Sequence, residues 1–203
     1  MSLNTFDLYL FGGTGDLSNR KLIPAMFRQE TLSSICTESN IIGIGSRNLT
    51  TDEYVEMVKD SLQKYFPNFD QHKDTWRLFS ARISYMQIDI NSDEGWNNLK
   101  EISADCAVIY YLATPPNLYK RISSALNEFN LIKENCRVVV EKPIGTDLNT
   151  AKEINDSLAT GFNESQIYRI DHYLGKEAVQ IFWLYDLVIQ FLSRVGLIPS
   201  RIV

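Results

Sequence analysis

The sequence has few of the residues that hold metals or build disulfide frameworks. Its 203 residues include three cysteines and two histidines. Cys36, Cys106 and Cys136 share no CxxC or zinc-type spacing, and their number is odd. A disulfide framework or a metal site is therefore not expected. We expect reduced thiols and no bound metal.

The sequence also lacks an excess of positive charge. Lys and Arg number 20 against 25 Asp and Glu, which gives a net charge of -5 and a pI near 5.1. Nucleic acid is disfavoured as a partner, because a phosphate backbone needs a broad basic face. A small anionic ligand needs only a local positive site and stays open.

Long apolar runs are missing as well. Residues 1–4 precede an expected strand without the charged and apolar regions of an export signal. The apolar stretch 181–203 contains Asp186, Gln190 and Arg194, which interrupt it before the ~20 residues that a membrane span needs. We expect a cytoplasmic protein that does not associate with a membrane.

What the sequence does contain is a regular alternation of short apolar runs and amphipathic stretches. With 44% hydrophobic residues, the chain can build one domain core, or one domain and a fragment of another. Strands are expected at 5–11, 40–45, 83–90, 106–113, 137–141 and 166–170. Helices are expected at 17–28, from a cap at Thr51 or Asp52 to Pro67, and at 92–103, 119–129 and 148–158. The pattern predicts a doubly wound parallel α/β sheet of the Rossmann-like kind.

Two parts of this pattern are less regular. Residues 69–82 are polar and are predicted to be irregular, with Trp76 and Phe79 as anchors. Residues 106–113 are almost continuously apolar, which is typical of a central strand covered on both faces. We therefore expect residues 106–113 in the middle of the sheet.

The first strand runs into a glycine-rich turn and then into a helix. Gly12, Gly13 and Gly15 lie within four residues of each other. A glycine pair alone indicates only a tight turn, but three glycines at a strand-to-helix junction favour dinucleotide binding. Asp16 either caps the helix or accepts a hydrogen bond from a ligand.

The end of the second strand carries information about the coenzyme. The run Gly45-Ser46-Arg47 contains no acid, and none follows until Asp52. NAD-binding folds use an acid here for the ribose hydroxyls, whereas an arginine suits the 2′-phosphate of NADP. A lone loop arginine is more often a solvated cation, so Arg47 alone is weak evidence. The absence of an acid together with Arg47 favours NADP, and NAD remains an alternative.

Three further motifs follow later strands, at the edge where open α/β sheets bind ligands. Prolines stiffen the backbone in two of them, Tyr111–Pro116 and Glu141–Pro143. A need for rigid backbone explains these prolines, but it does not explain a cation, Lys142, at the ligand edge. Pro143 is a candidate for a cis bond. Residues 168–177 carry acids, bases, a tyrosine pair and a histidine, and they predict an anion and sugar site.

At these motifs the sequence resembles the glucose-6-phosphate dehydrogenase family. Residues 12–17 with Lys21 are similar to the family's coenzyme turn, and Glu141-Lys142-Pro143-Ile144-Gly145 is similar to its Glu-Lys-Pro-Phe-Gly segment. Residues 169–177 match its signature Arg-Ile-Asp-His-Tyr-Leu-Gly-Lys-Glu at every position. This nonapeptide disfavours a different sugar dehydrogenase.

The resemblance implies oxidation of glucose 6-phosphate at C1 with reduction of NADP, the first step of the pentose phosphate pathway. It implies that Asp171 orients the histidine that acts as base, and that Lys142 contacts both substrate and coenzyme. The implied substrate residues are Lys21, Lys142, His172, Tyr173 and Lys176. The implied coenzyme residues are Gly12, Gly13, Thr14, Gly15, Asp16, Leu17, Ser46, Arg47, Thr114, Pro115 and Lys142.

The sequence departs from the family in two respects. Ser46 stands where the family usually has an arginine, so Arg47 must substitute from the next position. Neither His72 nor His172 lies at the position of the base, which belongs to a second, α+β domain. We expect a coenzyme domain at 1–180 without that domain, hence incomplete catalysis and no family-type homo-oligomer.

Residues 181–203 do not resemble the family. A one-base shift of the reading frame converts them into a family-like sequence, so we predict that 181–203 is an out-of-frame tail. A packing or dimerisation helix is the other interpretation of this stretch. The alternative function is that of a nucleotide-binding module or redox sensor that binds the nucleotide and catalyses no reaction.

Overall fold

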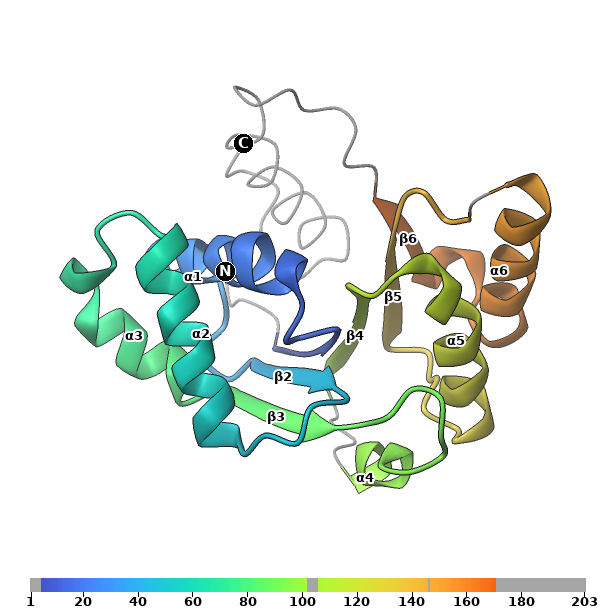
Figure 1. Ribbon diagram of the computed structural model, residues 1–203, viewed down its shortest axis with the longest axis horizontal. Helices are drawn as coiled ribbons and strands as arrows, with labels where there is room; N and C mark the ends of the chain where they lie inside the picture. The colour runs from blue at the N-terminus through green and yellow to red at the C-terminus, as the bar shows by residue number, and fades with distance from the viewer. Residues whose placement is uncertain (1–4, 102–105, 146, 171–203) are drawn as a thin grey trace.

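The computed structural model describes residues 5–101, 106–145 and 147–170. Its centre is one sheet of six parallel strands in the order β3-β2-β1-β4-β5-β6 (Figure 1). The strands are β1 (Phe6–Phe11), β2 (Asn40–Gly45), β3 (Ile83–Gln87), β4 (Ala107–Leu112), β5 (Cys136–Glu141) and β6 (Ile167–Ile170). The order reverses between β1 and β4, which defines a doubly wound fold. The predicted fold class is confirmed.

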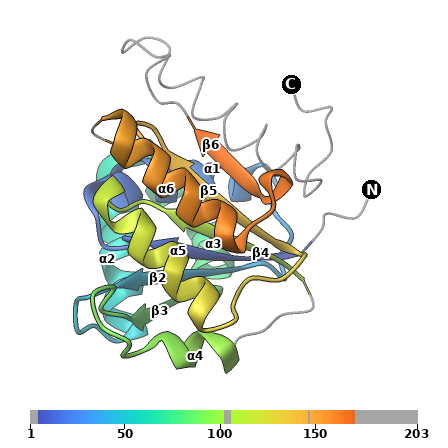
Figure 2. The same ribbon diagram turned by 90° about the vertical axis from the view of Figure 1, so that its right-hand side faces the viewer.

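Helices cover both faces of this sheet. The helices α1 (Ile23–Thr31), α2 (Thr51–Tyr65) and α3 (Lys73–Ser80) lie on one face, and α4 (Trp96–Glu101), α5 (Tyr119–Glu128) and α6 (Leu148–Gly161) lie on the other (Figures 1 and 2). Short turns of helix, η1 (Ser18–Leu22), η2 (Phe69–Gln71), η3 (Pro116–Leu118) and η4 (Glu164–Gln166), connect them. Within these described ranges, no helix is both long and apolar enough to cross a bilayer.

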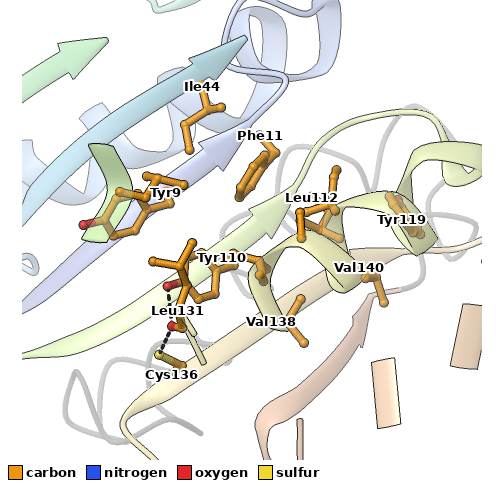
Figure 3. Packing of buried hydrophobic residues seen from close by; sticks show 14 of the residues in the cluster. Tyr9, Phe11, Ile44, Tyr110, Leu112, Tyr119, Leu131, Cys136, Val138 and Val140 are labelled. Carbon is orange, nitrogen blue, oxygen red and sulfur yellow. Dashed lines mark hydrogen bonds between the residues drawn. The ribbon is translucent and has the colours of Figure 1, made fainter. Parts of the chain in front are cut away.

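The alternation of side chains along β1 explains the two layers. Leu8 and Leu10 belong to the core under α1–α3, whereas Tyr9 and Phe11 belong to the core under α4–α6. Figure 3 shows part of the second core, including Tyr9 and Phe11. Phe11 stacks on Trp96, with the ring centroids 5.7 Å apart. A strand covered on both faces is expected to be largely apolar. All six residues of β1 are buried, and its one charged residue, Asp7, accepts a hydrogen bond from the Asn40 side-chain amide at 2.8 Å.

The stretch predicted to be irregular, 69–82, contains η2 and the helix α3 instead. The prediction was wrong because only one face of this short helix is apolar. Phe27 of α1 fills the space beneath it and meets Phe69 at 5.4 Å and Phe79 at 5.3 Å between ring centroids. Trp76 packs partly buried against the same core. The anchoring role predicted for Trp76 and Phe79 is therefore confirmed.

Several boundaries differ from those expected. The first helical segment begins at residues 16 and 17, passes through the π turn η1 and continues to Thr31, not Arg28. β3 ends at Gln87, although Ile88 and Ile90 remain buried. α4 begins at Trp96 instead of residue 92.

The residue that caps α2 is Thr50, not Thr51 or Asp52. Its hydroxyl accepts the Glu53 amide at 3.2 Å, and the Glu53 carboxylate accepts the Thr50 amide at 2.7 Å. The Thr50 amide, and next the Thr50 hydroxyl, which donates to the same carboxylate at 2.9 Å, lower the pKa of Glu53 below its ordinary value. Glutamate three residues after the threonine is the sequence signal of such a capping box, and it selects Thr50.

Replacing Thr50 with alanine is expected to lower the free energy of unfolding by about 1 kcal/mol, because the first turn of α2 loses its capping bonds. Urea denaturation followed by circular dichroism measures the change. Thr160→Ala is the control, since the hydroxyl of this exposed threonine donates, within the described part of the chain, only to Asp156 O of α6. Equal stability of the two variants would contradict the capping role.

Candidate functional site

The glycine-rich turn lies between the carboxyl ends of β2 and β4. The amides of Gly12 and Gly13 both donate to Ile44 O at 2.9 Å, and the amide of Ala113 donates to Phe11 O at 2.9 Å. These bonds tie the turn to its two neighbouring strands. The turn therefore lies at the point where the strand order reverses, which is the ligand edge of such sheets.

Two of the glycines serve the packing of this turn. Gly12 has φ of +81°, and a Cβ there would lie 2.6 Å from Ala113 O. A Cβ on Gly13 would lie 2.8 Å from the Cα of Gly43. A side chain fits at neither position, because a neighbouring strand is too near. Both glycines bring the backbone of the turn against β2 and β4.

The helix that follows opens at Gly15. The carbonyl of Gly15 accepts the Asn19 amide at 3.1 Å and the Asn19 side-chain amide at 2.8 Å. The amides of Asp16, Leu17 and Ser18 therefore belong to the first turn, where a helix supplies no acceptor. Such amides, together with the helix dipole, make an anion-binding site.

Asp16 does not act as the helix cap. Its exposed carboxylate pairs with Arg20 at 3.4 Å, one turn later, and the start of η1 has no side-chain cap. Lys21 is exposed in the same turn. Both side chains remain accessible beside the glycine turn.

Three residues that the sequence did not single out support this edge. Tyr54 is fully buried, and its hydroxyl donates to Gly13 O at 3.3 Å. Burial raises the pKa of Tyr54, so it stays a neutral donor. Ser18 donates to Gly12 O at 2.8 Å, and Tyr85 donates to Arg47 O at 2.9 Å. These hydroxyls hold the backbone on which a ligand would rest.

One signal in the sequence pointed to Tyr54. Gly43 lies inside β2, where glycine weakens a strand unless something approaches closely. A Cβ on Gly43 would lie 2.3 Å from Tyr54 Cζ. The glycine therefore marks the place where the Tyr54 ring passes β2 to reach the turn.

Two buried polar atoms at this edge have no hydrogen-bond partner among the residues that the structure describes. They are the hydroxyl oxygen of Thr114 and Oδ1 of Asn19. Thr114 follows β4, and its methyl carbon would lie 3.2 Å from a Cβ on Gly12. A buried polar atom without a partner is costly and calls for an explanation. The site thus fits a ligand with hydroxyl, amide or phosphate groups.

Other residues predicted for the site follow the neighbouring strands. Ser46 and Arg47 are exposed after β2, and Pro115 is exposed after β4. Lys142 is exposed after β5, and its amide donates to Ile170 O at 2.8 Å. The Lys142–Pro143 peptide is cis, as the sequence suggested. The predicted residues Asp171, His172, Tyr173 and Lys176 lie outside the described residues.

A cavity of about 650 Å³ lies at the opposite, amino edge of the sheet. Its lining includes Thr5, Glu30, Cys36 and Asp74 and none of the glycine-turn residues. In the described part of the chain, no group of three or more His, Cys, Asp or Glu could hold a metal ion.

Comparisons with known proteins agree with this geometry. A family model described as "Glucose-6-phosphate dehydrogenase, NAD binding domain" matches residues 9–181. Glucose-6-phosphate 1-dehydrogenase from Rhizobium meliloti is 40% identical over 178 residues, which cover 86% of this chain and 36% of the relative. The enzyme from Gluconobacter oxydans is 43% identical over 181 residues, which cover 86% and 37%.

Solved structures give the same result. A glucose-6-phosphate dehydrogenase in complex with its substrate glucose-6-phosphate has a TM-score of 0.76 and 34% identity, covering 95% of this chain and 42% of that chain. The enzyme from Mycobacterium avium has a TM-score of 0.75 and 31% identity, covering 88% and 38%. The chain spans a little over a third of the length of the curated relatives it matches. This chain therefore belongs to the glucose-6-phosphate dehydrogenase family and carries that family's NAD-binding domain.

Proposed function

We propose that this chain binds NADP across the carboxyl ends of β2, β1, β4 and β5, as the coenzyme domain of a glucose-6-phosphate dehydrogenase. The observation that carries the proposal is the helix opening at Gly15, where three first-turn amides lie beside a tight glycine turn. The pyrophosphate rests on the amides of Asp16, Leu17 and Ser18. Gly12 and Gly13 do not donate to it, because both amides are bonded to Ile44 O.

The preference for NADP over NAD rests on the end of β2. Ser46 and Arg47 follow the strand, and the next acid in the sequence is Asp52, which lies in the first turn of α2. Tyr85 holds the carbonyl of Arg47, so the backbone from which the guanidinium extends is fixed. The guanidinium of Arg47 pairs with the 2′-phosphate, where NAD has only a hydroxyl.

Thermal-shift titration with NADP and with NAD tests the proposal, because a bound ligand stabilises the folded chain by mass action. We expect NADP to raise Tm at lower concentration than NAD. Arg47→Ala is expected to weaken NADP binding roughly 10–100-fold, the effect of about 1.5–3 kcal/mol for a charged hydrogen bond. NAD binding is expected to stay unchanged.

Arg77→Ala is the matched control for this experiment. Arg77 is an exposed arginine on α3, whose residues Asp74 and Leu78 line the cavity at the other edge of the sheet. Its loss removes the same charge without touching the proposed site. If NADP and NAD stabilise the chain equally, or if both arginine variants weaken NADP alike, the 2′-phosphate assignment is wrong.

The remaining chemistry is proposed from family membership. Glucose 6-phosphate loses the C1 hydrogen as hydride to the nicotinamide, while a base takes the proton of the C1 hydroxyl. Lys142, His172, Tyr173 and Lys176 hold the sugar phosphate, assisted by Lys21, and Asp171 orients the base. His72 does not fit that role, because it packs edge-on against Phe27 and Phe66 with centroids 6.2 and 5.6 Å apart. We propose that this chain alone binds coenzyme without turnover.

A nucleotide-binding module without chemistry is the second function compatible with this site. Formation of NADPH from glucose 6-phosphate, followed at 340 nm, would exclude such a module and the proposed lack of turnover together. Redox sensing through thiols is disfavoured for two cysteines. Burial raises the pKa of Cys106 to about 11 and also raises that of Cys136, which keeps both thiols protonated. The three free cysteines fit the reducing cytoplasm, where we place the chain.

Residues 181–203 lie outside the described residues, and the family match ends at 181. Their out-of-frame origin stays a prediction. The nucleotide sequence of the gene tests it, since restoring the frame must produce family-like residues directly after Gln180.

A further inference from the structure

Two buried tyrosines hold Glu141, the last residue of β5. The hydroxyl of Tyr111 donates to Glu141 Oε1 at 2.7 Å. The hydroxyl of Tyr119 accepts the Glu141 amide at 3.3 Å and donates to the Glu141 carbonyl at 3.4 Å. The side chain and the main chain of this residue are therefore fixed by separate partners.

The two tyrosines approach from opposite faces of the sheet. Tyr111 belongs to the core under α1–α3, and Tyr119 belongs to the core under α4–α6. Burial, and next the nearby Glu141, raise the pKa of Tyr111 well above its ordinary value. Burial also raises the pKa of Tyr119 to about 12. Both hydroxyls therefore remain donors at any working pH.

Lys142 comes directly after this clamped residue. Its amide donates to Ile170 O at 2.8 Å, and the peptide to Pro143 is cis. The peptide between Glu141 and Lys142 is thus bonded through its carbonyl to Tyr119 and through its amide to Ile170 O. These bonds fix the start of the backbone from which the Lys142 side chain extends.

The topology assigns this part of the edge to one end of the coenzyme. The glycine turn after β1 lies in the middle, and Arg47 after β2 lies on the adenosine side. β4 and β5 lie on the other side of the point where the order reverses. A dinucleotide whose phosphates lie on the turn therefore extends its nicotinamide toward Thr114 and Lys142.

From this geometry we infer that Tyr111 is a positioning residue, which acts through the Glu141 carboxylate on the nicotinamide end of the bound coenzyme. The inference rests on the proposed function. Removing the hydroxyl leaves the Tyr111 ring in the core and the main chain of Glu141 bonded to Tyr119, but it takes the Tyr111 hydrogen bond from the Glu141 carboxylate. The adenosine end, more than one strand away, keeps its contacts.

The test compares two ligands by isothermal titration of this chain. NADP contains the nicotinamide, and 2′-phospho-ADP-ribose is the same molecule without it. Tyr111→Phe is expected to weaken NADP binding about 5–20-fold, less than the roughly 10–100-fold of a direct hydrogen bond to a charged group, because Tyr111 acts on the coenzyme only through Glu141. Binding of 2′-phospho-ADP-ribose is expected to change less than about twofold.

Tyr110→Phe is the matched control. Tyr110 is a neighbouring buried tyrosine whose hydroxyl donates to Leu131 O at 2.8 Å, on the other face of the sheet (Figure 3). It loses a buried hydrogen bond as well, so it reports any effect of lower stability on binding. Tyr110→Phe is expected to bind both ligands as the unmodified chain does.

The possible results separate this inference from the proposed function. If the unmodified chain binds 2′-phospho-ADP-ribose but Tyr111→Phe weakens both ligands equally, or neither, the positioning role is wrong while the coenzyme site stands. The positioning role also fails if both tyrosine variants behave alike. If the unmodified chain binds neither ligand, the proposed function fails and the inference fails with it.

Discussion

Replacing Arg82 with methionine is expected to lower the free energy of unfolding by about 3–5 kcal/mol, the usual cost of breaking a buried ion pair from one side. Arg82 follows α3 and pairs with Glu30 of α1, and the two side chains are 9% and 6% exposed. It also donates to the carbonyls of Cys36 at 3.1 Å and Ser39 at 2.8 Å. Methionine leaves a buried carboxylate and two carbonyls without this donor.

Urea denaturation of three variants tests this expectation. The double variant Glu30→Met, Arg82→Met is expected to recover part of the loss, because it removes both buried charges. Lys120→Met breaks the exposed pair with Glu153, whose side chains are 60% and 62% exposed, and is expected to cost less than about 1 kcal/mol. A similar loss of stability in Arg82→Met and Lys120→Met would show that the buried ion pair contributes no more to the free energy of unfolding than the exposed one.

Replacing Gly12 with alanine is expected to destabilise the chain and to abolish measurable NADP binding. The positive φ of +81° is strained for alanine by about 1–3 kcal/mol. The new Cβ would also lie 2.6 Å from Ala113 O, and relieving such a contact costs about 1–3 kcal/mol more. The turn can relax only by moving away from β4, which displaces the first helical turn from the phosphate site.

Gly15→Ala separates the two effects of that substitution. Its Cβ would have its nearest neighbour, Gly12 O, at 3.0 Å and no other atom closer than 3.9 Å. A small shift accommodates it, so we expect near-normal stability but weaker NADP binding, because Gly15 opens the phosphate-binding turn. Unfolding curves and NADP titrations of both variants check this. Unchanged NADP affinity in Gly12→Ala would refute the role of the turn.

The sequence predicted the sheet well because parallel strands covered on both faces are largely apolar. Every residue of β1 and all but the first of β4 are buried, and such runs are visible without a structure. α3 was missed because its apolar residues Trp76 and Phe79 form one narrow face, and their partner Phe27 lies about 50 residues earlier.

The site was predictable where its residues are close in sequence and hidden where strand register brings them together. The glycine turn forms one continuous segment and was recognised. The bond from Tyr111 to Glu141 depends on Tyr111 pairing with Val139, which places Glu141 two residues ahead on the same face. Nothing in the sequence states that register. The bond from Tyr54 to Gly13 depends instead on how α2 packs over β2, and Gly43 is the one sign of it in the sequence.

The central claim, that the first helical turn after the glycines holds the coenzyme, is tested most directly by an NMR titration of the ¹⁵N-labelled chain with NADP. We predict saturable shifts of the amides of Thr14, Asp16 and Leu17. The amides of Ser33 and Thr37, which line the cavity at the opposite edge, are predicted to stay unchanged. Saturating NADP that leaves the glycine-turn amides in place, or shifts only those of the opposite edge, would contradict the account.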